Sequence, residues 1–137
     1  MRVEVGMSAP AVTYGPLTRT DIVRYAGASN DFNPVHHDET FARAAGYPGV
    51  LAHGMLSAGL LASFITAWFG PGSVRRFRVR FREIVWPGDQ LRAEGVVTAV
   101  ASAPKPGEPP LAELDLTLRN QHGIPVVTGN ATVALPE

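Results

Sequence analysis

The sequence predicts an α+β fold in which one long helix packs against a curved antiparallel sheet. The most apolar stretch, GMLSAGLLASFITAWFG at residues 54–70, is apolar on nearly all sides, which is typical of a helix at the centre of a core. After it, the hydrophobic period changes to the two-residue alternation of strands. Four strand candidates follow with connections too short for parallel crossovers, so we expect an antiparallel meander.

Capping signals place two further helices before the long one. Residues 17–29 form the first, with Thr18 as its N-cap and Asp21 three residues later in a capping box. A short second helix spans residues 38–46, and the long helix extends from about residue 53 to residue 69, before a Gly-Pro-Gly stop. A possible first strand precedes these helices.

The first strand after the long helix carries a row of arginines on one face. Apolar side chains alternate there with Arg76, Arg78, Arg80 and Arg82, so we expect one buried and one solvated face. The other strand candidates span residues 91–101, 111–120 and 124–135. A sheet of this kind has two open edges, and we therefore expect a dimer.

Composition limits the classes of function. The 137 residues suit one domain, residues 1–137, and 45% apolar with 18% charged residues is typical of a folded protein. Twelve basic and twelve acidic side chains cancel, which argues against nucleic-acid or membrane binding through a global positive field. The apolar run is shorter than the roughly 20 residues of a membrane span. Without cysteine the chain has no disulfides or thiolate metal sites, and we expect a cytoplasmic protein.

The polar stretch NDFNPVHHDE at residues 30–39 concentrates titratable side chains beside a proline. Pro34 fixes its own φ and favours an extended Asn33, whose side chain can hydrogen-bond the turn. Such a loop can hold Asp31 and His36 in fixed positions, and histidine is the side chain best suited to proton transfer near neutral pH. Taken alone, the loop leaves open a catalytic pair or a purely structural turn.

A metal site is the third interpretation of this region. The possible ligands are His36, His37, Asp38 and His53. Adjacent histidines on an extended segment point in opposite directions, which separates the first two. The spacing also matches no familiar metal motif such as H-E-x-x-H. We therefore expect no metal.

A second signal is the sequence AHGM at residues 52–55, where the long helix begins. The start of a helix leaves backbone N–H groups unpaired and carries a partial positive charge. Gly54 has no side chain, so a carbonyl oxygen could approach its N–H closely and be polarised there. Taken alone, the glycine could equally mark a tight entry turn.

The two signals together resemble the hydratase motif of the MaoC-like hydratase/dehydratase family, whose members have the hot-dog fold. The resemblance rests on YAGASNDFNPVHHD at residues 25–38 and LAHGM at residues 51–55, and continues through VRFREIVWPGDQL at residues 79–91. It covers nearly the whole chain. One departure is Asn30, where the family usually has glycine. Asparagine tolerates a left-handed backbone better than other non-glycine residues, so we expect the turn to survive.

The resemblance implies an (R)-specific enoyl-CoA hydratase or 3-hydroxyacyl dehydratase that needs no cofactor and no metal. It implies that a trans-2-enoyl thioester of CoA or acyl carrier protein (ACP) lies in a tunnel at a dimer interface. The thioester carbonyl would accept the Gly54 N–H, and Asp31 and His36 would activate one water. The product would be the (3R)-hydroxyacyl thioester, or the enoyl thioester in the reverse direction.

The same resemblance implies supporting roles for several neighbours. Asn33 would hold the loop, and His53 would frame the glycine turn instead of taking part in the chemistry. Some members of the family place a serine in the pocket from the central helix, and Ser57 and Ser63 are the candidates here. His37 is expected to face solvent or the substrate rim.

Partners and alternatives remain open at this point. The expected assembly is a homodimer, with a heterodimer containing another hot-dog subunit as the alternative, in which this chain would be the catalytic subunit. A hot-dog acyl-CoA thioesterase is the alternative reaction, because it also polarises a carbonyl at a helix start. The arginine row from Arg76 to Arg82 could face solvent, or could bind a CoA phosphate or an acidic carrier protein.

Overall fold

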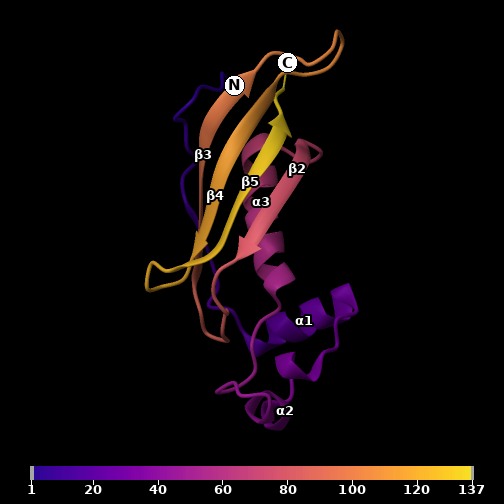
Figure 1. The fold of residues 1–137 in the computed structure, drawn as a ribbon, viewed down its shortest axis with the longest axis vertical. Helices are drawn as coiled ribbons and strands as arrows, with labels where there is room; N and C mark the ends of the chain where they lie inside the picture. Colours follow the sequence, from indigo (N-terminus) through magenta and orange to yellow (C-terminus); the bar gives the residue numbers. More distant parts are fainter. Residues whose placement is uncertain (1, 137) are drawn as a thin grey trace.

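A computed structural model describes residues 2–136, which form a five-stranded antiparallel sheet and three α-helices (Figure 1). The helices are α1 (Arg19–Ser29), α2 (Glu39–Ala44) and α3 (Gly54–Phe69), with a single 3₁₀ turn, η1 (Pro34–His36). The strands are β1 (Val12–Tyr14), β2 (Val74–Phe81), β3 (Leu91–Ala101), β4 (Leu111–Arg119) and β5 (Pro125–Ala134). Within this part of the chain, no helix has the length and apolar character needed to cross a membrane.

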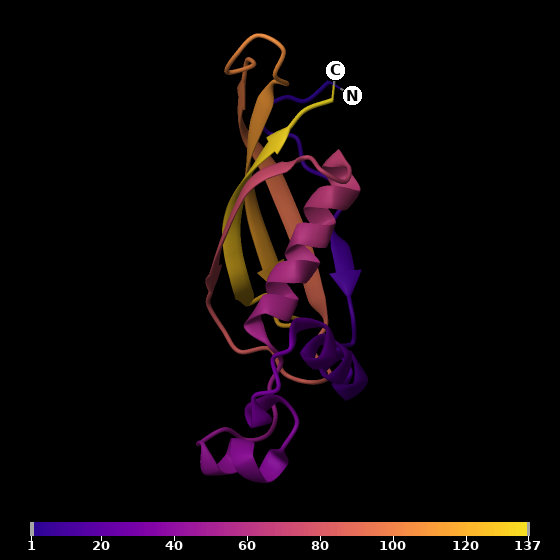
Figure 2. The same ribbon diagram turned by 90° about the vertical axis from the view of Figure 1, so that its right-hand side faces the viewer.

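The long helix α3 lies along one face of the sheet, as the sequence predicted (Figure 2). Its side chains Leu61, Phe64 and Ile65 are at most 1% exposed and belong to the same core cluster as Leu114 and Leu118 of β4. Each such side chain contributes about 1.5–3 kcal/mol relative to an exposed position. Helices α1 and α2 lie beyond one end of the sheet, so the start of α3 is where the two parts of the fold meet (Figures 1 and 2).

The strand order is β1-β3-β4-β5-β2, which corrects the predicted four-strand meander. Only β3, β4 and β5 form consecutive hairpins, whereas β2 pairs with β5 at the far edge. The connection at 82–90 is therefore no tight turn between neighbouring strands. Its backbone is hydrogen-bonded outside the sheet, with Ala52 N–H donating to the Val85 carbonyl and Leu17 N–H to the Asp89 carbonyl, both at 2.9 Å. These bonds join residues that are far apart in the sequence, so local sequence patterns could not predict them.

Helix boundaries follow the predicted capping residues. Thr18 and Asp21 form the capping box of α1: the Asp21 N–H donates to Thr18 Oγ1 at 3.0 Å, and the Thr18 N–H to Asp21 Oδ2 at 2.8 Å. Asp38 caps α2 by accepting the Phe41 N–H at 3.1 Å. Each cap contributes about 1 kcal/mol. Thr18 thus fixes where α1 begins, and Asp38 fixes where the polar loop between α1 and α2 ends.

The close approach of β2 and β5 at Gly129 generates a stability prediction. Gly129→Ala should lower the free energy of unfolding by about 2 kcal/mol, because an added Cβ would overlap the Arg78 carbonyl oxygen. Gly27→Ala in α1 is the matched control: nothing lies within 4 Å of its added Cβ, and alanine should stabilise the helix by up to about 1 kcal/mol. Urea denaturation measures both, and a shift of the same sign in the two variants would contradict this packing argument.

Candidate active site

α1 ends at a residue with a left-handed backbone, as expected for Asn30, which stands where the family usually has glycine. Asn30 has φ 59° and ψ 27°, and it is the one non-glycine residue with positive φ in the described range 2–136. Ser29 supports the same turn, since its hydroxyl donates to the Tyr25 carbonyl at 2.7 Å and accepts the Asp31 N–H at 3.3 Å. The sharp reversal brings Asp31 back toward the start of α3.

The following turn is held by side chains of the loop itself, as predicted. Asp31 Oδ1 accepts the Asn33 N–H at 3.3 Å, and Asn33 Oδ1 accepts the Val35 N–H at 3.1 Å. Pro34 opens η1, where its missing N–H costs no hydrogen bond. These bonds occupy one oxygen of the Asp31 carboxylate and leave Oδ2 directed at His36.

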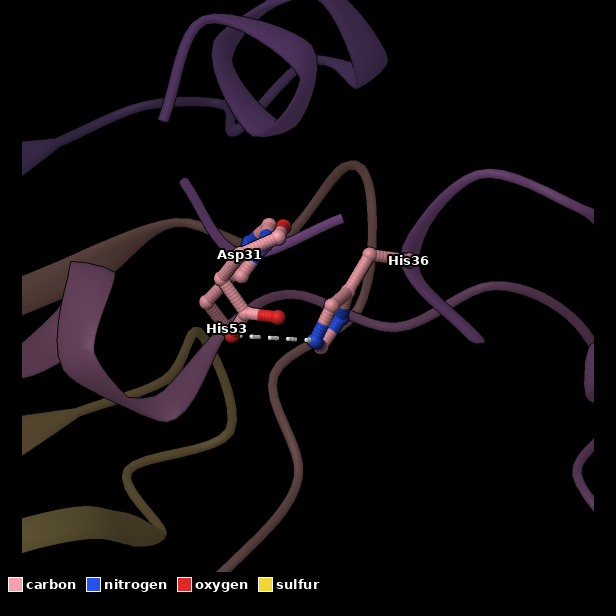
Figure 3. Close-up of side chains that lie close together, drawn as sticks. All are labelled: Asp31, His36 and His53. Atoms are coloured by element: carbon pink, nitrogen blue, oxygen red, sulfur yellow. Dashed lines mark hydrogen bonds and ion pairs between the residues drawn. The ribbon is translucent and has the colours of Figure 1, made fainter. Parts of the chain in front are cut away.

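The ring of His36 is oriented by a backbone carbonyl. Its Nδ1 lies 2.7 Å from the Leu51 oxygen, and because a carbonyl can only accept, Nδ1 carries the hydrogen. The lone pair of the neutral ring is then on Nε2, which lies 3.9 Å from Asp31 Oδ2 (Figure 3). That separation is too long for a hydrogen bond, but one water can lie about 2.8 Å from both atoms. The loop thus presents two proton acceptors to a common point.

Burial keeps His36 neutral. Loss of solvent lowers the pKa of the imidazole below its ordinary value of 6.5, and the neighbouring His53 ring acts in the same direction. The Leu51 carbonyl and the Asp31 carboxylate oppose this shift without cancelling it. At neutral pH His36 is therefore a base, able to accept a proton at Nε2.

His53 contacts both members of this pair. Its ring stacks on His36 with centroids 3.7 Å apart, meets the Tyr25 ring edge-on at 4.8 Å, and is 2% exposed. Its Nε2 donates to the Asp31 backbone carbonyl at 3.1 Å. The sequence predicted that His53 frames the start of α3, which it does as N-cap residue. The sequence did not predict that the His53 ring stacks on His36 or that it contacts the Tyr25 ring; it only placed these residues in the same motif.

A cavity of about 330 Å³ opens at the start of α3; His53 lines it, whereas Asp31 and His36 do not. Gly54, Ser57 and Phe81 line it, and an added Cβ on Gly54 would lie 3.2 Å from the Phe81 ring. The Ser57 hydroxyl and His53 Nδ1 are buried without a hydrogen-bond partner among the described residues. Such groups are rare in folded proteins and are costly unless a ligand or water binds them.

The other serine candidate, Ser63, does not reach this cavity. Its hydroxyl donates to the Gly59 carbonyl at 3.0 Å within α3, and the residue is exposed. His37 is also exposed, as predicted, and lines a small apolar hollow together with His36, Phe32 and Val23. Residues that the sequence did not indicate as cavity lining are Phe81, Arg82 and Val127, all from the sheet or its edge.

Asp31, His36 and His53 also come close enough to suggest a metal site, with ligand atoms within 4.8 Å of one another. The ring geometry argues against it. Nitrogen lone pairs lie in the plane of an imidazole, and the His36 and His53 rings are stacked with only 26° between their planes. Lone pairs of stacked rings point side by side and do not converge on one ion.

Comparison with known proteins gives consistent matches. Residues 3–109 match the MaoC like domain family. The (R)-specific enoyl-CoA hydratase of Aeromonas caviae is 32% identical over 139 residues, which cover 95% of this chain and 100% of that protein. The mitochondrial 3-hydroxyacyl-(acyl-carrier-protein) dehydratase of Arabidopsis thaliana is 35% identical over 117 residues, covering 85% of this chain and 69% of that protein.

Solved structures agree over nearly the full length. An (R)-hydratase from A. caviae involved in PHA biosynthesis superposes with a TM-score of 0.83 at 32% identity, covering 98% of both chains. A chain of the ChsH1-ChsH2 complex from Mycobacterium tuberculosis superposes with a TM-score of 0.84 at 26% identity, covering 98% of this chain and 100% of that chain.

The environment of His36 leads to a pH prediction that needs no substrate. NMR titration should give this imidazole a pKa below 6.5, because burial disfavours its charged form. Asp31→Asn should lower the pKa further, since it removes the carboxylate that attracts the imidazolium. Asp115→Asn, a carboxylate on the outer face of the sheet, should leave the titration unchanged. A wild-type pKa above 6.5 would contradict the role of burial.

Proposed function

The chain belongs to the MaoC-like domain family and has its hot-dog fold, and we propose that it is an enzyme that hydrates trans-2-enoyl thioesters to (3R)-hydroxyacyl thioesters and catalyses the reverse dehydration. The observation that carries this proposal is the pair of proton acceptors, Asp31 Oδ2 and His36 Nε2, which lie 3.9 Å apart. His53 stacks on His36 and lines the cavity at the start of α3, so it connects the pair to that cavity. The hydratases and the dehydratase among its relatives support the same reaction class.

The substrate carbonyl is proposed to bind at the first turn of α3. His53 gives this helix no side-chain cap, so backbone N–H groups at its start are available to a ligand. Gly54 is the first helical residue and lines the cavity, which lets a thioester oxygen reach its N–H. The positive end of the helix then stabilises the enolate-like charge that develops on this oxygen. No cofactor or metal is required for that step.

The proton transfers follow from the two acceptors. One water donates its hydrogens to Asp31 and His36, and its oxygen attacks C3 of the enoyl group as one of the two takes a proton. Electrons from the C2–C3 double bond move to the thioester oxygen, and the proton returns to C2 as the carbonyl re-forms. The overall change is addition of H and OH across the double bond, with both residues restored to their starting states. Asn33 and His53 act by holding these two side chains.

Ser57 is proposed as a second donor to the thioester oxygen. Its hydroxyl is buried in the cavity wall one helical turn beyond His53 and lacks a partner within the described part of the chain. A hydroxyl in that state can donate to a ligand without first breaking a bond to the protein. Side-chain donors of this kind contribute about 10²–10³ in rate in other acyl-transfer sites.

The proposed substrates are acyl-CoA or acyl-ACP, and the proposed assembly is a homodimer in the cytoplasm. β2 is an edge strand with one side unpaired, and Met55, Phe81 and Ile84 near the cavity are 59%, 50% and 38% exposed. A second subunit packed there would cover them and enclose the cavity. The ChsH1-ChsH2 complex supports an unlike hot-dog subunit as the alternative partner.

The first test of the function is hydration of crotonyl-CoA, followed as loss of enoyl absorbance, with Asp31→Asn. The variant keeps the shape of the side chain but removes the base, so kcat should fall by about 10²–10⁴. Asp38→Asn is the matched control, because asparagine caps a helix as well as aspartate does and activity should stay within about twofold.

Retention of full activity in Asp31→Asn would exclude the proposed base. A folded wild-type chain that is inactive toward crotonyl-CoA would instead direct the search to longer acyl chains, to ACP thioesters or to an unlike subunit. Asp31→Asn remains the matched comparison with each of these.

The proposed role of Ser57 predicts different effects of one substitution on activity and on stability. Ser57→Ala should lower kcat by about tenfold or more, because the thioester oxygen loses a donor. The same change should leave the free energy of unfolding equal or higher, since it removes a buried hydroxyl that has no partner. Steady-state kinetics and urea denaturation of one sample measure both quantities. A loss of stability with unchanged kcat would show that Ser57 is structural.

A further inference from the structure

Three arginines on the outer face of β2, Arg76, Arg78 and Arg80, together with Arg82 directly after the strand, form what we call the arginine face. They alternate with Phe77 and Val79, which pack against the core, so the arginines point away from α3. The three within β2 stand opposite Thr132, Asn130 and Thr128 of β5. All four are exposed, and β2 forms one edge of the sheet (Figure 1).

The guanidiniums of this face have no ion-pair partner within the described residues, although Glu113 and Asp115 of β4 lie on the same side of the sheet. None of the four guanidiniums forms an ion pair there, although other arginines in the described range do. A groove of about 570 Å³ runs along the face, and its one acidic lining residue is Asp115 of β4. The whole chain has no net charge, yet the four arginines of this face are a third of its twelve basic residues. Like charges on one face of a strand repel, and this arrangement costs stability unless an anionic partner binds.

The arginine face is continuous with the active-site cavity. Arg82 lines both the outer groove and the cavity that contains Gly54 and Ser57. Its guanidinium is oriented by a 3.0 Å hydrogen bond from Nε to Thr128 Oγ1. A thioester with its carbonyl at Gly54 extends its carrier out of the cavity, and Arg82 connects that exit to the rest of the face.

The length of the face indicates the kind of carrier. The six steps from Arg76 to Arg82 span about 20 Å at 3.3 Å per strand residue. One or two guanidiniums are enough for either the 3′-phosphate or the diphosphate of CoA, because a guanidinium binds phosphate through two parallel hydrogen bonds, and the row is longer than either group. A row of four matches an extended acidic surface better.

We propose that the arginine face is the docking surface for an acidic acyl carrier protein, and that the carrier-bound enoyl thioester is the substrate that the site favours. This inference rests on the proposed function and names the carrier for it. Charge complementarity then steers the carrier to the mouth of the cavity and raises the rate of productive encounter.

The test compares two substrates on one variant, Arg78→Gln/Arg80→Gln. Both side chains are exposed and unpaired in the described chain, so the variant should fold normally. With the crotonyl thioester of the organism's own ACP, kcat/KM at low ionic strength should fall about tenfold or more. With crotonyl-CoA it should stay within about twofold. Added salt should weaken the wild-type reaction with crotonyl-ACP more than that of the variant.

The control variant Arg2→Gln/Lys105→Gln removes the same two charges elsewhere on the surface and should leave both substrates unaffected. An equal loss with crotonyl-CoA and crotonyl-ACP would assign the face to phosphate binding and overturn the proposal. Unchanged kcat/KM for crotonyl-ACP would overturn it as well.

Binding of unacylated ACP, measured by fluorescence anisotropy, tests docking without turnover. The Kd should rise about tenfold or more in Arg78→Gln/Arg80→Gln, and an unchanged Kd would overturn docking even if the hydratase activity is present. Conversely, tight binding of ACP by a wild-type chain that hydrates neither crotonyl thioester would leave the docking surface standing, and would direct the search for the reaction to longer acyl chains or to an unlike subunit.

Discussion

The contacts of one buried imidazole determine the geometry of the site. His53 is the residue between the loop and α3, its ring stacks on His36, and its Nε2 donates to the Asp31 carbonyl. Asp31, His36 and the start of α3 are therefore all positioned by one side chain. The ring is able to do this because it is flat: it offers one N–H to a carbonyl and a face to another ring. A smaller or flexible side chain at this position could satisfy one of these contacts but not all of them.

The start of α3 lacks stabilising interactions that are present in the rest of the fold. Elsewhere helix ends are capped and core side chains are apolar and fully buried, as at Thr18 and Phe64. At the start of α3 the cap is missing and two buried polar atoms have no partner in the described residues, while Phe81 stays half exposed. A ligand that supplies an acceptor, and a subunit that covers the phenyl ring, would complete these interactions. Incomplete bonding in a well-packed protein is thus itself an indication of where binding takes place.

Sequence reasoning succeeded where the cause of a structure is local. The caps of α1 and α2, the left-handed Asn30 and the side-chain bonds of the Asn33-Pro34 turn depend on residues two to four positions apart. It failed at the partner of β2, because strand order depends on pairing between distant segments. The same limit applies to the cavity: Phe81 and Arg82 approach Gly54 only after β2 has joined the sheet edge, and alternation alone could not show it. The functional roles of Asp31, His36, Gly54 and Ser57 rest on geometry joined with family membership.

The position of β2 beside β5 also determines when β2 can join the sheet during synthesis of the chain. Val74 pairs with Val133 and Phe81 with Val127, so the strand that contributes Phe81 to the cavity wall gains its neighbour only when the last part of the chain is available. During synthesis the loop, α3 and β2 all leave the ribosome before that strand exists. Until then β2 has an open edge on both sides and its apolar residues are uncovered, a state prone to wrong association.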